Sequence, residues 1–443
     1  MPDSQRQASN QAQPQPTWRE SLAVYLQPRV LIVMLLGFSS GLPLALSGST
    51  LRFWLRESHI DLEIIGLFAL VGTPYTIKFL WAPLVDALNV PFLSKAFGRR
   101  RGWLILSQIL LVAAIFLLGF CNPATTPWYV PFGGALLVAT ASATQDIVVD
   151  AFRIESLPKD EQAAGMASYV AAYRISTLVS TAGALYLIDV IETSGIARGD
   201  AWKFGYAAMA ALIVIGIVTA LFATEPDQSR IIAEKNTGNP LQRVIATTKA
   251  AFLDFLTLDA AIVILLFVVL FKFTDAFSGI MTEAFVIDIG FSKVDYAAIV
   301  KVVGLIATLA GGFAGGFVAR RYSLVTSLWI GGIVQAVANL SFSWLALIGP
   351  YKWGLALAIT AENFTSAIGT VIFVAYLSAL CRNPLHTATQ YALLTALAAV
   401  GRTYLSAGAG YVAKASGWPM FFVICMLVAI PSLLLLALSL IHI

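Results

Sequence analysis

The sequence predicts an all-α membrane protein with about twelve spanning helices, and three observations carry this prediction. Of its 443 residues, 58% are hydrophobic and only 12% are charged. A soluble domain is about half apolar and about a quarter charged. The apolar residues form segments of about 20 residues, the length that an α-helix needs to cross a bilayer. No stretch shows the alternation over about ten residues that is typical of a membrane β-barrel strand.

The apolar segments fall into two groups of six. The longest polar stretch between spans, Glu225 to Thr257, separates the groups, and its part from Leu241 to Leu256 is amphipathic and suits a membrane surface. We therefore expect a tail at 1–28, a first half at 29–223, a linker at 224–257 and a second half at 258–443. The expected spans are 29–53, 62–86, 103–120, 128–153, 163–189, 202–223, 258–285, 294–319, 323–348, 353–380, 387–413 and 418–441.

The distribution of Lys and Arg predicts the orientation of the chain. With the N-terminus inside, the inner loops carry roughly 16 basic residues and the outer loops roughly 7. The N-terminal tail is rich in Gln and Pro and lacks the apolar core of a signal peptide, so we expect a disordered cytoplasmic segment. Both termini are therefore predicted to be cytoplasmic. The same rule explains the net charge of +4 without nucleic-acid binding.

A stripe of charged residues interrupts the fourth span. Ser142, Asp146, Asp150 and Arg153 share one helix face, because a helix turns by about 100° per residue. An ionisable group inside a spanning helix is costly, so it usually faces a cavity or a partner. Lys78 in the second span lies at a similar depth, and we expect it to pair with Asp146. The alternative to a role in transport is a static pair that only holds two helices together.

Further polar residues lie inside the later spans. Lys272 and Asp275 are three residues apart and can face the same way. Arg174 either binds an anionic group or neutralises one of the carboxylates of the fourth span. Glu283 lies near the outer end of the seventh span, where we expect its side chain to reach water. The predicted proton-coupling residues are Asp146, Lys78, Asp275 and Glu362, and the predicted substrate-binding residues are Gln145, Tyr173, Arg174, Lys272, Asn363, Gln390, Tyr391 and Arg402.

These residues favour a transporter of a large, polar, charged solute. An ion pore would more simply need one ring of like charges. The sequence contains no Ser/His/Asp set, no metal-ligand cluster and no P-loop, so we expect neither an enzyme nor an ATP-driven pump. The three cysteines lack metal or redox spacing, and we expect no cofactor. The expected partners are a small-molecule substrate, protons and the lipid bilayer, with no nucleic acid and a monomeric chain.

Two further patterns point to a known fold. Gly-Phe-Ser-Ser-Gly-Leu at 37–42 and Phe-Thr-Asp-Ala-Phe-Ser-Gly at 273–279 occupy matching places in the two halves. The loop after the second span contains Pro-Leu-Val-Asp at 83–86 and Gly-Arg-Arg-Arg at 98–101, which resembles a signature of the major facilitator superfamily. The predicted fold is therefore the major facilitator fold of two six-helix halves. We expect Asp86, Arg99, Arg100, Asp150 and Arg153 to form a cytoplasmic gate, whereas the alternative is that the arginines only set topology.

Motifs over nearly the whole chain identify a closer resemblance. They lie at 37–46, 60–61, 78–83, 98–103, 145–150, 173–174, 271–277, 362–363, 388–394, 401–402 and 417–418. In these motifs the chain resembles the AmpG-type muropeptide permeases. That resemblance implies an importer in the bacterial inner membrane. The implied substrates are disaccharides of N-acetylglucosamine and anhydro-N-acetylmuramic acid, with or without a peptide.

The resemblance also implies coupling to the proton motive force and a part in cell-wall recycling and, in some bacteria, in β-lactamase induction. The residues themselves leave two alternatives open. One is a related facilitator for another anionic sugar, peptide or coenzyme-like solute. The other is a membrane sensor that binds a ligand without moving it.

Overall fold

The computed structural model describes residues 23–158, 161–226, 261–380 and 387–441. Throughout these residues all regular elements are helices. Within the same ranges, 11 helical segments are long and apolar enough to cross a membrane. The predicted class of all-α membrane protein is thus confirmed. The tail up to residue 22 and the amphipathic segment expected at 241–256 lie outside the described residues.

The first half forms six consecutive crossings, several of which are broken into shorter helices. The second crossing contains two 3-10 turns, η2 (Phe68–Gly72) and η3 (Lys78–Leu80), and the fifth contains a π-helical turn, η4 (Val179–Gly183). The helices of this half are α2 (Pro28–Ser47), α3 (Ser49–Glu57), α4 (Leu62–Leu67), α5 (Thr73–Ile77), α6 (Ala82–Ala87), α7 (Leu93–Phe97), α8 (Arg99–Phe120), α9 (Tyr129–Ser156), α10 (Gln162–Leu178), α11 (Ala184–Thr193) and α12 (Arg198–Phe222).

The second half has the same plan. Its breaks include the π-helical turn η5 (Tyr296–Val303) and the 3-10 turn η6 (Leu405–Gly408), which interrupts the crossing expected at 387–413. That crossing is not among the 11 segments. The helices are α15 (Ala261–Phe271), α16 (Phe273–Gly279), α17 (Thr282–Ile289), α18 (Lys293–Asp295), α19 (Gly304–Arg321), α20 (Leu324–Ile348), α21 (Lys352–Leu380), α22 (Thr387–Tyr404), α23 (Ala409–Ser416), α24 (Trp418–Leu427) and α25 (Ala429–Ile441).

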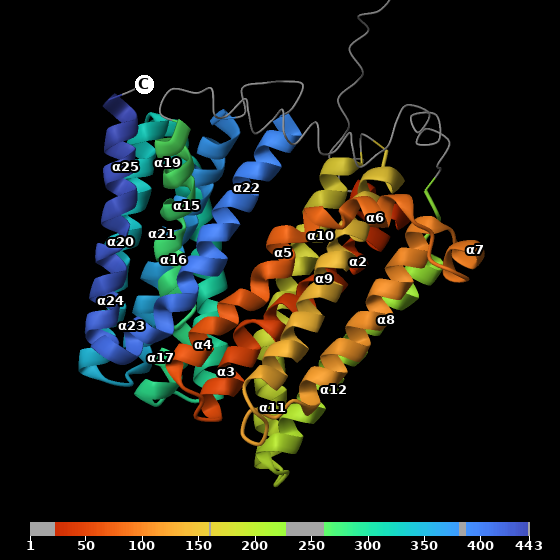
Figure 1. Ribbon diagram of the computed structural model, residues 1–443, viewed down its shortest axis with the longest axis horizontal. Helices are drawn as coiled ribbons and strands as arrows, with labels where there is room; N and C mark the ends of the chain where they lie inside the picture. The colour runs from red at the N-terminus through yellow and green to blue at the C-terminus, as the bar shows by residue number, and fades with distance from the viewer. Residues whose placement is uncertain (1–22, 159–160, 227–260, 381–386, 442–443) are drawn as a thin grey trace, which may run out of the picture.

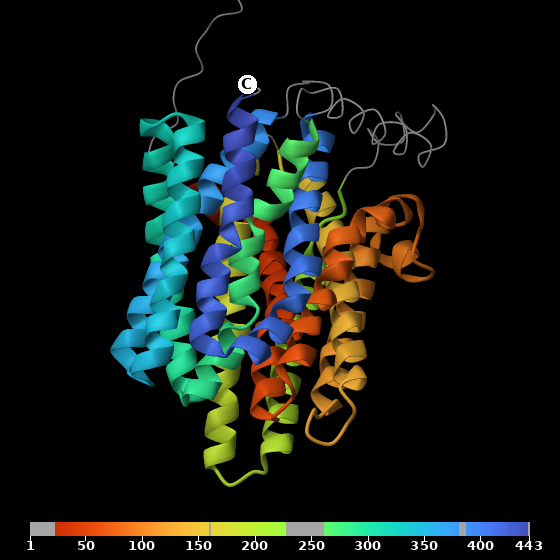
Figure 2. The same ribbon diagram turned by 60° about the vertical axis from the view of Figure 1, so that its left-hand side comes forward.

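The two halves touch at one end and diverge at the other (Figure 1). At the end where they touch, α3 packs on α17 and α4 packs on α23, while η4 meets η5. We call this the closed end. The opposite end, where α6 and α7 lie and where the chain finishes, is the open end (Figure 1). The hairpin of α11 and α12 projects farthest at the closed end, also in the turned view of Figure 2.

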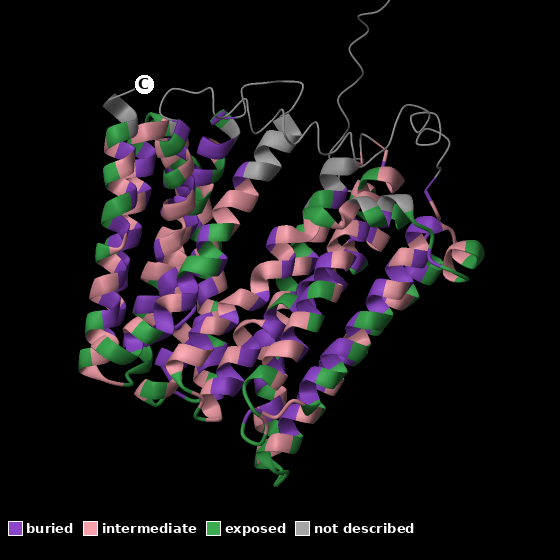
Figure 3. Ribbon diagram, in the orientation of Figure 1, coloured by how far each residue is buried: buried purple, intermediate pink, exposed green. Residues whose placement is uncertain are grey.

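One hydrophobic core joins the two halves at the closed end. Trp54 stacks on Trp202 with ring centroids 4.9 Å apart, and the same cluster continues into Phe285, Phe342 and Phe422 of the second half. The other clusters of buried residues each belong to a single half. Buried residues are accordingly densest where the two bundles meet (Figure 3). Hydrophobic burial therefore holds the halves together at the closed end, while each half keeps a core of its own.

Small residues let α2 and α10 approach each other closely. A Cβ atom added to Gly41 would lie 2.0 Å from Ser176 Oγ and 2.4 Å from the carbonyl oxygen of Tyr173. Close approach of helices at glycine is a common device in membrane proteins, where packing rather than water drives helix association. This contact fixes the backbone of Tyr173 against α2.

We expect Gly41→Ala to destabilise the protein by about 1–3 kcal/mol, because the methyl group would force α2 and α10 apart. Gly312→Ala is the matched control, since a Cβ atom there meets nothing within 4 Å. Alanine in an open helical position is instead stabilising by about 0.5–1 kcal/mol. Thermal unfolding of the purified variants in one detergent measures the difference. Equal midpoints for the two variants would contradict the tight packing of α2 on α10.

Candidate functional site

A cavity of about 380 Å³ lies between the two halves. Its lining brings together Asp146, Tyr75 and Tyr173 from the first half and Arg402 from the second, while Arg52 of α3 contributes a second guanidinium. Apolar side chains, glycines and the hydroxyl residues Ser47, Thr403 and Ser406 complete the wall. This volume falls within the range of small-molecule sites, about 300–1,000 Å³. One carboxylate, two guanidinium groups and two phenols form a site for a polar solute that carries anionic groups.

Asp146 has an unsatisfied oxygen in this cavity. Its Oδ1 atom is buried and accepts no hydrogen bond from the described residues, and the buried hydroxyl of Tyr75 is also without a partner there. A buried polar atom without a hydrogen bond is destabilising by about 1–3 kcal/mol. Both residues line the cavity, although these two atoms themselves are shielded from solvent.

The predicted ion pair between Lys78 and Asp146 is wrong for this structure. Neither residue takes part in an ion pair of the described chain, although Lys78 remains within electrostatic range of Asp146. The reason is local geometry, because Lys78 begins η3 directly after α5 and η2 precedes that helix. A 3-10 turn has about 3.0 residues per turn instead of 3.6, so the face and depth of Lys78 differ from those of a regular helix.

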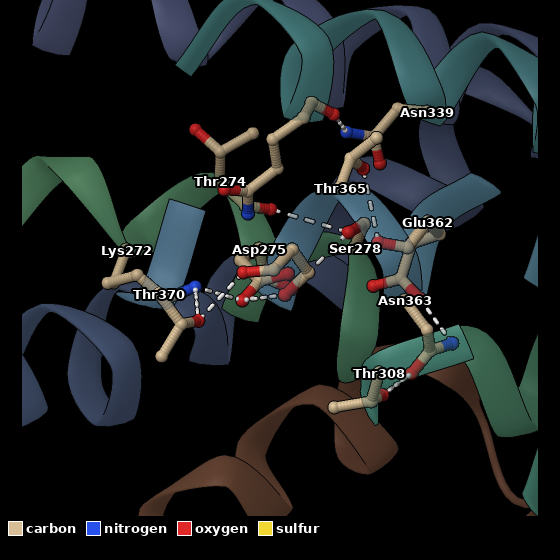
Figure 4. A network of polar contacts seen from close by, with 12 residues as sticks. Lys272, Thr274, Asp275, Ser278, Thr308, Asn339, Glu362, Asn363, Thr365 and Thr370 are labelled. Atoms are coloured by element: carbon tan, nitrogen blue, oxygen red, sulfur yellow. Dashed lines mark hydrogen bonds and ion pairs between the residues drawn. The ribbon is translucent and has the colours of Figure 1, made fainter. Parts of the chain in front are cut away.

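Lys272 and Asp275 form the ion pair that their spacing predicts. The Nζ atom of Lys272 lies 2.6 Å from Asp275 Oδ2 and also donates to Thr370 Oγ1 at 3.0 Å. Ser366 Oγ donates to the same carboxylate oxygen at 2.9 Å. Figure 4 shows the lysine and the aspartate pointing at each other beside α21. The sequence did not single out Ser366 or Thr370, which α21 brings to the pair.

Glu362 and Asn363 belong to a neighbouring polar network on α21. The amide of Asn363 donates to Glu362 Oε2 at 2.8 Å and accepts from Thr308 Oγ1 of α19 at 3.3 Å (Figure 4). A buried polar network of this kind fixes helix orientation when its members are satisfied. Neither residue lines the cavity described above.

Two predicted binding residues, Gln145 and Arg174, are placed away from the cavity by the structure. Gln145 is fully buried and donates to Ser40 Oγ at 3.0 Å, so it packs α9 on α2 instead of facing the cavity. Arg174 is exposed and makes no ion pair with Asp146 or Asp150 in the described chain. One residue along α10 is a rotation of about 100°, so Tyr173 and Arg174 face different ways. The side chains of Gln390 and Tyr391 lie outside the described residues.

The predicted gate residues lie toward the open end of the first half. Arg153 pairs with Asp150 at 3.6 Å, and Arg100 Nε donates to Glu155 Oε2 at 2.9 Å. Arg99 is buried, and the side chain of Asp86 is outside the described residues. The contacts named here remain within the first half. The sequence did not identify Glu155, whose partner is 55 positions away.

The closed end holds a set of ion pairs between the halves that the sequence did not predict. Lys293 joins two carboxylates of the first half at 2.8 and 2.6 Å. These charges lie on helices near the ends of spanning segments, where the two halves meet. We call this set the closed-end ion pairs: Arg52–Glu283, Arg56–Asp288, Lys293–Glu57, Lys293–Glu192 and Lys414–Glu63.

Glu283 does not reach water as the sequence predicts. It is only 3% exposed, and both of its oxygens lie 3.3 Å from nitrogens of Arg52. Tyr296 also donates to Glu283 Oε1 at 3.1 Å. The prediction was wrong because the compensating cation lies in the other half of the chain.

Two six-helix halves around one polar cavity are the architecture of a secondary transporter. The profile described as Major Facilitator Superfamily matches residues 33–404. The chain is 40% identical to the anhydromuropeptide permease of Escherichia coli (strain K12) over 417 residues, which cover 94% of this chain and 80% of that protein. It is 35% identical to putative transporter AmpG 4 of Rickettsia conorii, covering 93% and 97% of the two chains. The chain therefore belongs to the major facilitator superfamily and, within it, to the AmpG-type permeases.

Solved structures agree with this fold. The nucleoside transporter NupG superposes with a TM-score of 0.68 at 15% identity, covering 94% of this chain and 99% of that chain. The D-xylose–proton symporter superposes with a TM-score of 0.64 at 13% identity, covering 93% and 97%. At these identities the similarity establishes the fold, and it confirms the predicted arrangement of two helical halves.

We expect the cavity to be reachable from solvent, and cysteine labelling measures this. In a background of Cys121→Ala, Cys381→Ala and Cys425→Ala, Arg402→Cys should react with a membrane-impermeant maleimide about tenfold faster than Ala358→Cys, because a thiol must be exposed to react. Arg402 is exposed along the cavity, whereas Ala358 is fully buried. Protein in lipid nanodiscs presents both ends to the reagent. Equal labelling rates would contradict an accessible cavity.

Proposed function

We propose that this protein imports peptidoglycan breakdown products across the bacterial inner membrane. The proposed substrates are GlcNAc–anhydroMurNAc disaccharides with or without a short peptide. The supporting observation is a polar cavity, lined from both halves by Asp146, Arg52 and Arg402, in a chain 40% identical to an anhydromuropeptide permease. The single chain supplies both halves of that cavity, which supports a working monomer.

The side chains of the cavity match the groups of such a solute. The lactyl carboxylate of the muramic acid and the carboxylates of a peptide are planar anions that a guanidinium group binds with two hydrogen bonds. Tyr75 and Tyr173 line the cavity, and aromatic rings of this kind pack well on the apolar faces of sugar rings. Asp146 accepts hydrogen bonds from sugar hydroxyls, amides or a peptide ammonium group.

We infer that transport proceeds by alternating access. The closed-end ion pairs and the shared core would part while the open end comes together, so that the cavity faces each side in turn. The open end carries Arg99, Arg100 and Arg101 at the start of α8, and an excess of basic residues marks the cytoplasmic side. On this assignment the structure is open to the cytoplasm, with both termini inside.

We further propose that proton coupling uses carboxylates inside the membrane. Asp146 is the leading candidate, because it lines the cavity and has no ion partner among the described residues. Asp275 pairs with Lys272, and Glu362 of α21 lies within electrostatic range of Asp275, so a proton on either carboxylate would change the charge balance of the second half. Lys78, within electrostatic range of Asp146, would adjust the charge balance when a proton binds.

Uptake into vesicles tests the proposed function. Labelled GlcNAc–anhydroMurNAc should accumulate in right-side-out vesicles that contain the protein when a proton gradient is imposed, and should not accumulate when the gradient is collapsed. Vesicles without the protein are the control. Binding without accumulation under any gradient would favour a sensor. Failure to bind the disaccharide, together with uptake of another anionic solute, would favour a related facilitator.

Asp146→Asn should abolish accumulation driven by the gradient while the protein still inserts and binds the disaccharide, because the amide cannot carry the proton. Exchange of internal for external substrate should persist in this variant. Asp200→Asn is the control, since Asp200 at the start of α12 has a half-exposed side chain, pairs with Lys203 and does not line the cavity. Full accumulation by Asp146→Asn would rule out Asp146 as the proton carrier.

A further inference from the structure

We propose that Arg52 binds an anionic group of the substrate and that this binding competes with the Arg52–Glu283 ion pair at the closed end. Occupation of the cavity would thereby weaken the contact that closes it. The inference rests on the proposed function for the identity of the solute. It adds a residue that takes part in both substrate recognition and closure.

Arg52 lies between the cavity and the closed end. Arg52 is one of the residues that line the cavity. Its Nε and Nη2 atoms each lie 3.3 Å from an oxygen of Glu283. Charge-assisted N–H···O bonds of good geometry are about 2.7–2.9 Å long. The contact is therefore a long one, and 15% of the arginine side chain is exposed against 4% of the glutamate. A carboxylate in the cavity would therefore compete with Glu283 for this guanidinium.

Glu283 keeps partners of its own half when Arg52 leaves. Tyr296 donates to Glu283 Oε1 at 3.1 Å, and Lys301 Nζ lies 3.9 Å from the same atom. A carboxylate left alone in a buried site would be strongly destabilising. Here the remaining pair of Lys301 and Glu283 is neutral, so the two halves can separate without stranding that charge.

Arg52 is the cation that opening of the closed end would leave alone. Lys301 and Glu283 belong to the same half, and Lys301 also lies within electrostatic range of Glu362 of that half. Arg52 belongs to the other half and loses its carboxylate partner when the halves part. A bound carboxylate would neutralise it. Arg52 would thus gain a carboxylate of the substrate as its partner when the Arg52–Glu283 ion pair of the closed end breaks.

The Arg56–Asp288 pair provides a built-in comparison. Arg56 follows Arg52 by one helical turn on α3 and also pairs with a carboxylate of α17, which accepts from Trp418 Nε1 at 3.0 Å. Arg56 does not line the cavity. It therefore contributes to closure without contacting a solute, and a change at Arg56 separates loss of closure from loss of binding.

The test combines ligand binding with a distance measurement. Binding of GlcNAc–anhydroMurNAc and of its neutral carboxamide is measured on purified protein, and the ratio of the two affinities reports recognition of the carboxylate. Spin labels at Ser194→Cys and Tyr351→Cys, in a background without other cysteines, report the distance between the halves at the closed end. Both positions are exposed and lie on different halves.

We expect Arg52→Gln to lower affinity for the acid by about tenfold to a hundredfold and to abolish the preference over the carboxamide, since a hydrogen bond to a charged group is lost. Arg52→Lys should restore part of that preference. Glu283→Gln should raise affinity for the acid severalfold and lengthen the label distance without ligand, because it removes the competitor. Arg56→Gln should lengthen the distance and leave the acid-to-amide ratio unchanged.

Two results would overturn the competition. One is a wild-type acid preference in Arg52→Gln. The other is a lower affinity of Glu283→Gln for the acid, which would make Glu283 a residue that positions Arg52 for binding. If Arg52→Gln does not fold, Arg52→Lys and Glu283→Gln still show whether Glu283 lowers or raises the affinity for the acid. Absence of disaccharide binding by the wild-type protein would overturn the proposed function as well, whereas binding with an Arg52-independent preference overturns this inference alone.

Discussion

A charge inside the membrane needs an ion partner or a polar cavity, and the arrangement of this protein follows from that constraint. Lys272 and Asp275 satisfy each other within one half. Arg52 and Glu283 satisfy each other only when the two halves touch at the closed end. Asp146 has no ion partner among the described residues and lies in the wall of the cavity. The Lys272–Asp275 pair therefore stabilises one half, and the Arg52–Glu283 pair depends on the conformation. Asp146 remains available to a solute.

The closed end combines weak ion pairs with a more strongly attractive hydrophobic core. Exposed ion pairs such as Lys414–Glu63 are weak because water and salt screen them, so they set register without locking the halves. The shared aromatic core around Trp54 and Phe285 supplies the larger attraction. Close backbone contact adds to it, because a Cβ atom on Gly410 would lie 1.8 Å from the carbonyl oxygen of Leu62 in the other half. A device that must open repeatedly needs such a balance.

Features that depend on neighbouring residues, such as spans and short-range ion pairs, could be predicted from the sequence. Contacts that depend on distant segments or on broken helices could not. Composition was sufficient for all the expected spans except 387–413, and a spacing of three residues was sufficient for the ion pair of Lys272 and Asp275. The Lys78–Asp146 pair failed because 3-10 turns change the helix rotation before Lys78. The prediction that Glu283 reaches water was wrong because its partner, Arg52, precedes it by 231 positions in the sequence. The repeat of the two halves makes the first and seventh spans equivalent. The opposite charges at the ends of these two spans were the signal that could have revealed the pair.

The charged stripe on α9 divides along its length, and the division relates proton coupling to closure. Asp150 pairs with Arg153 toward the open end, whereas Asp146 faces the cavity. Arg52 lines the same cavity from the closed end, so under the proposed function one solute would contact both Asp146 and Arg52. A carboxylate bound by Arg52 adds negative charge near Asp146, and a nearby negative charge favours the protonated form of an acid. Substrate binding would then weaken the Arg52–Glu283 pair and favour proton uptake together. Coupling of this kind needs no long-range pathway, because both groups share one cavity.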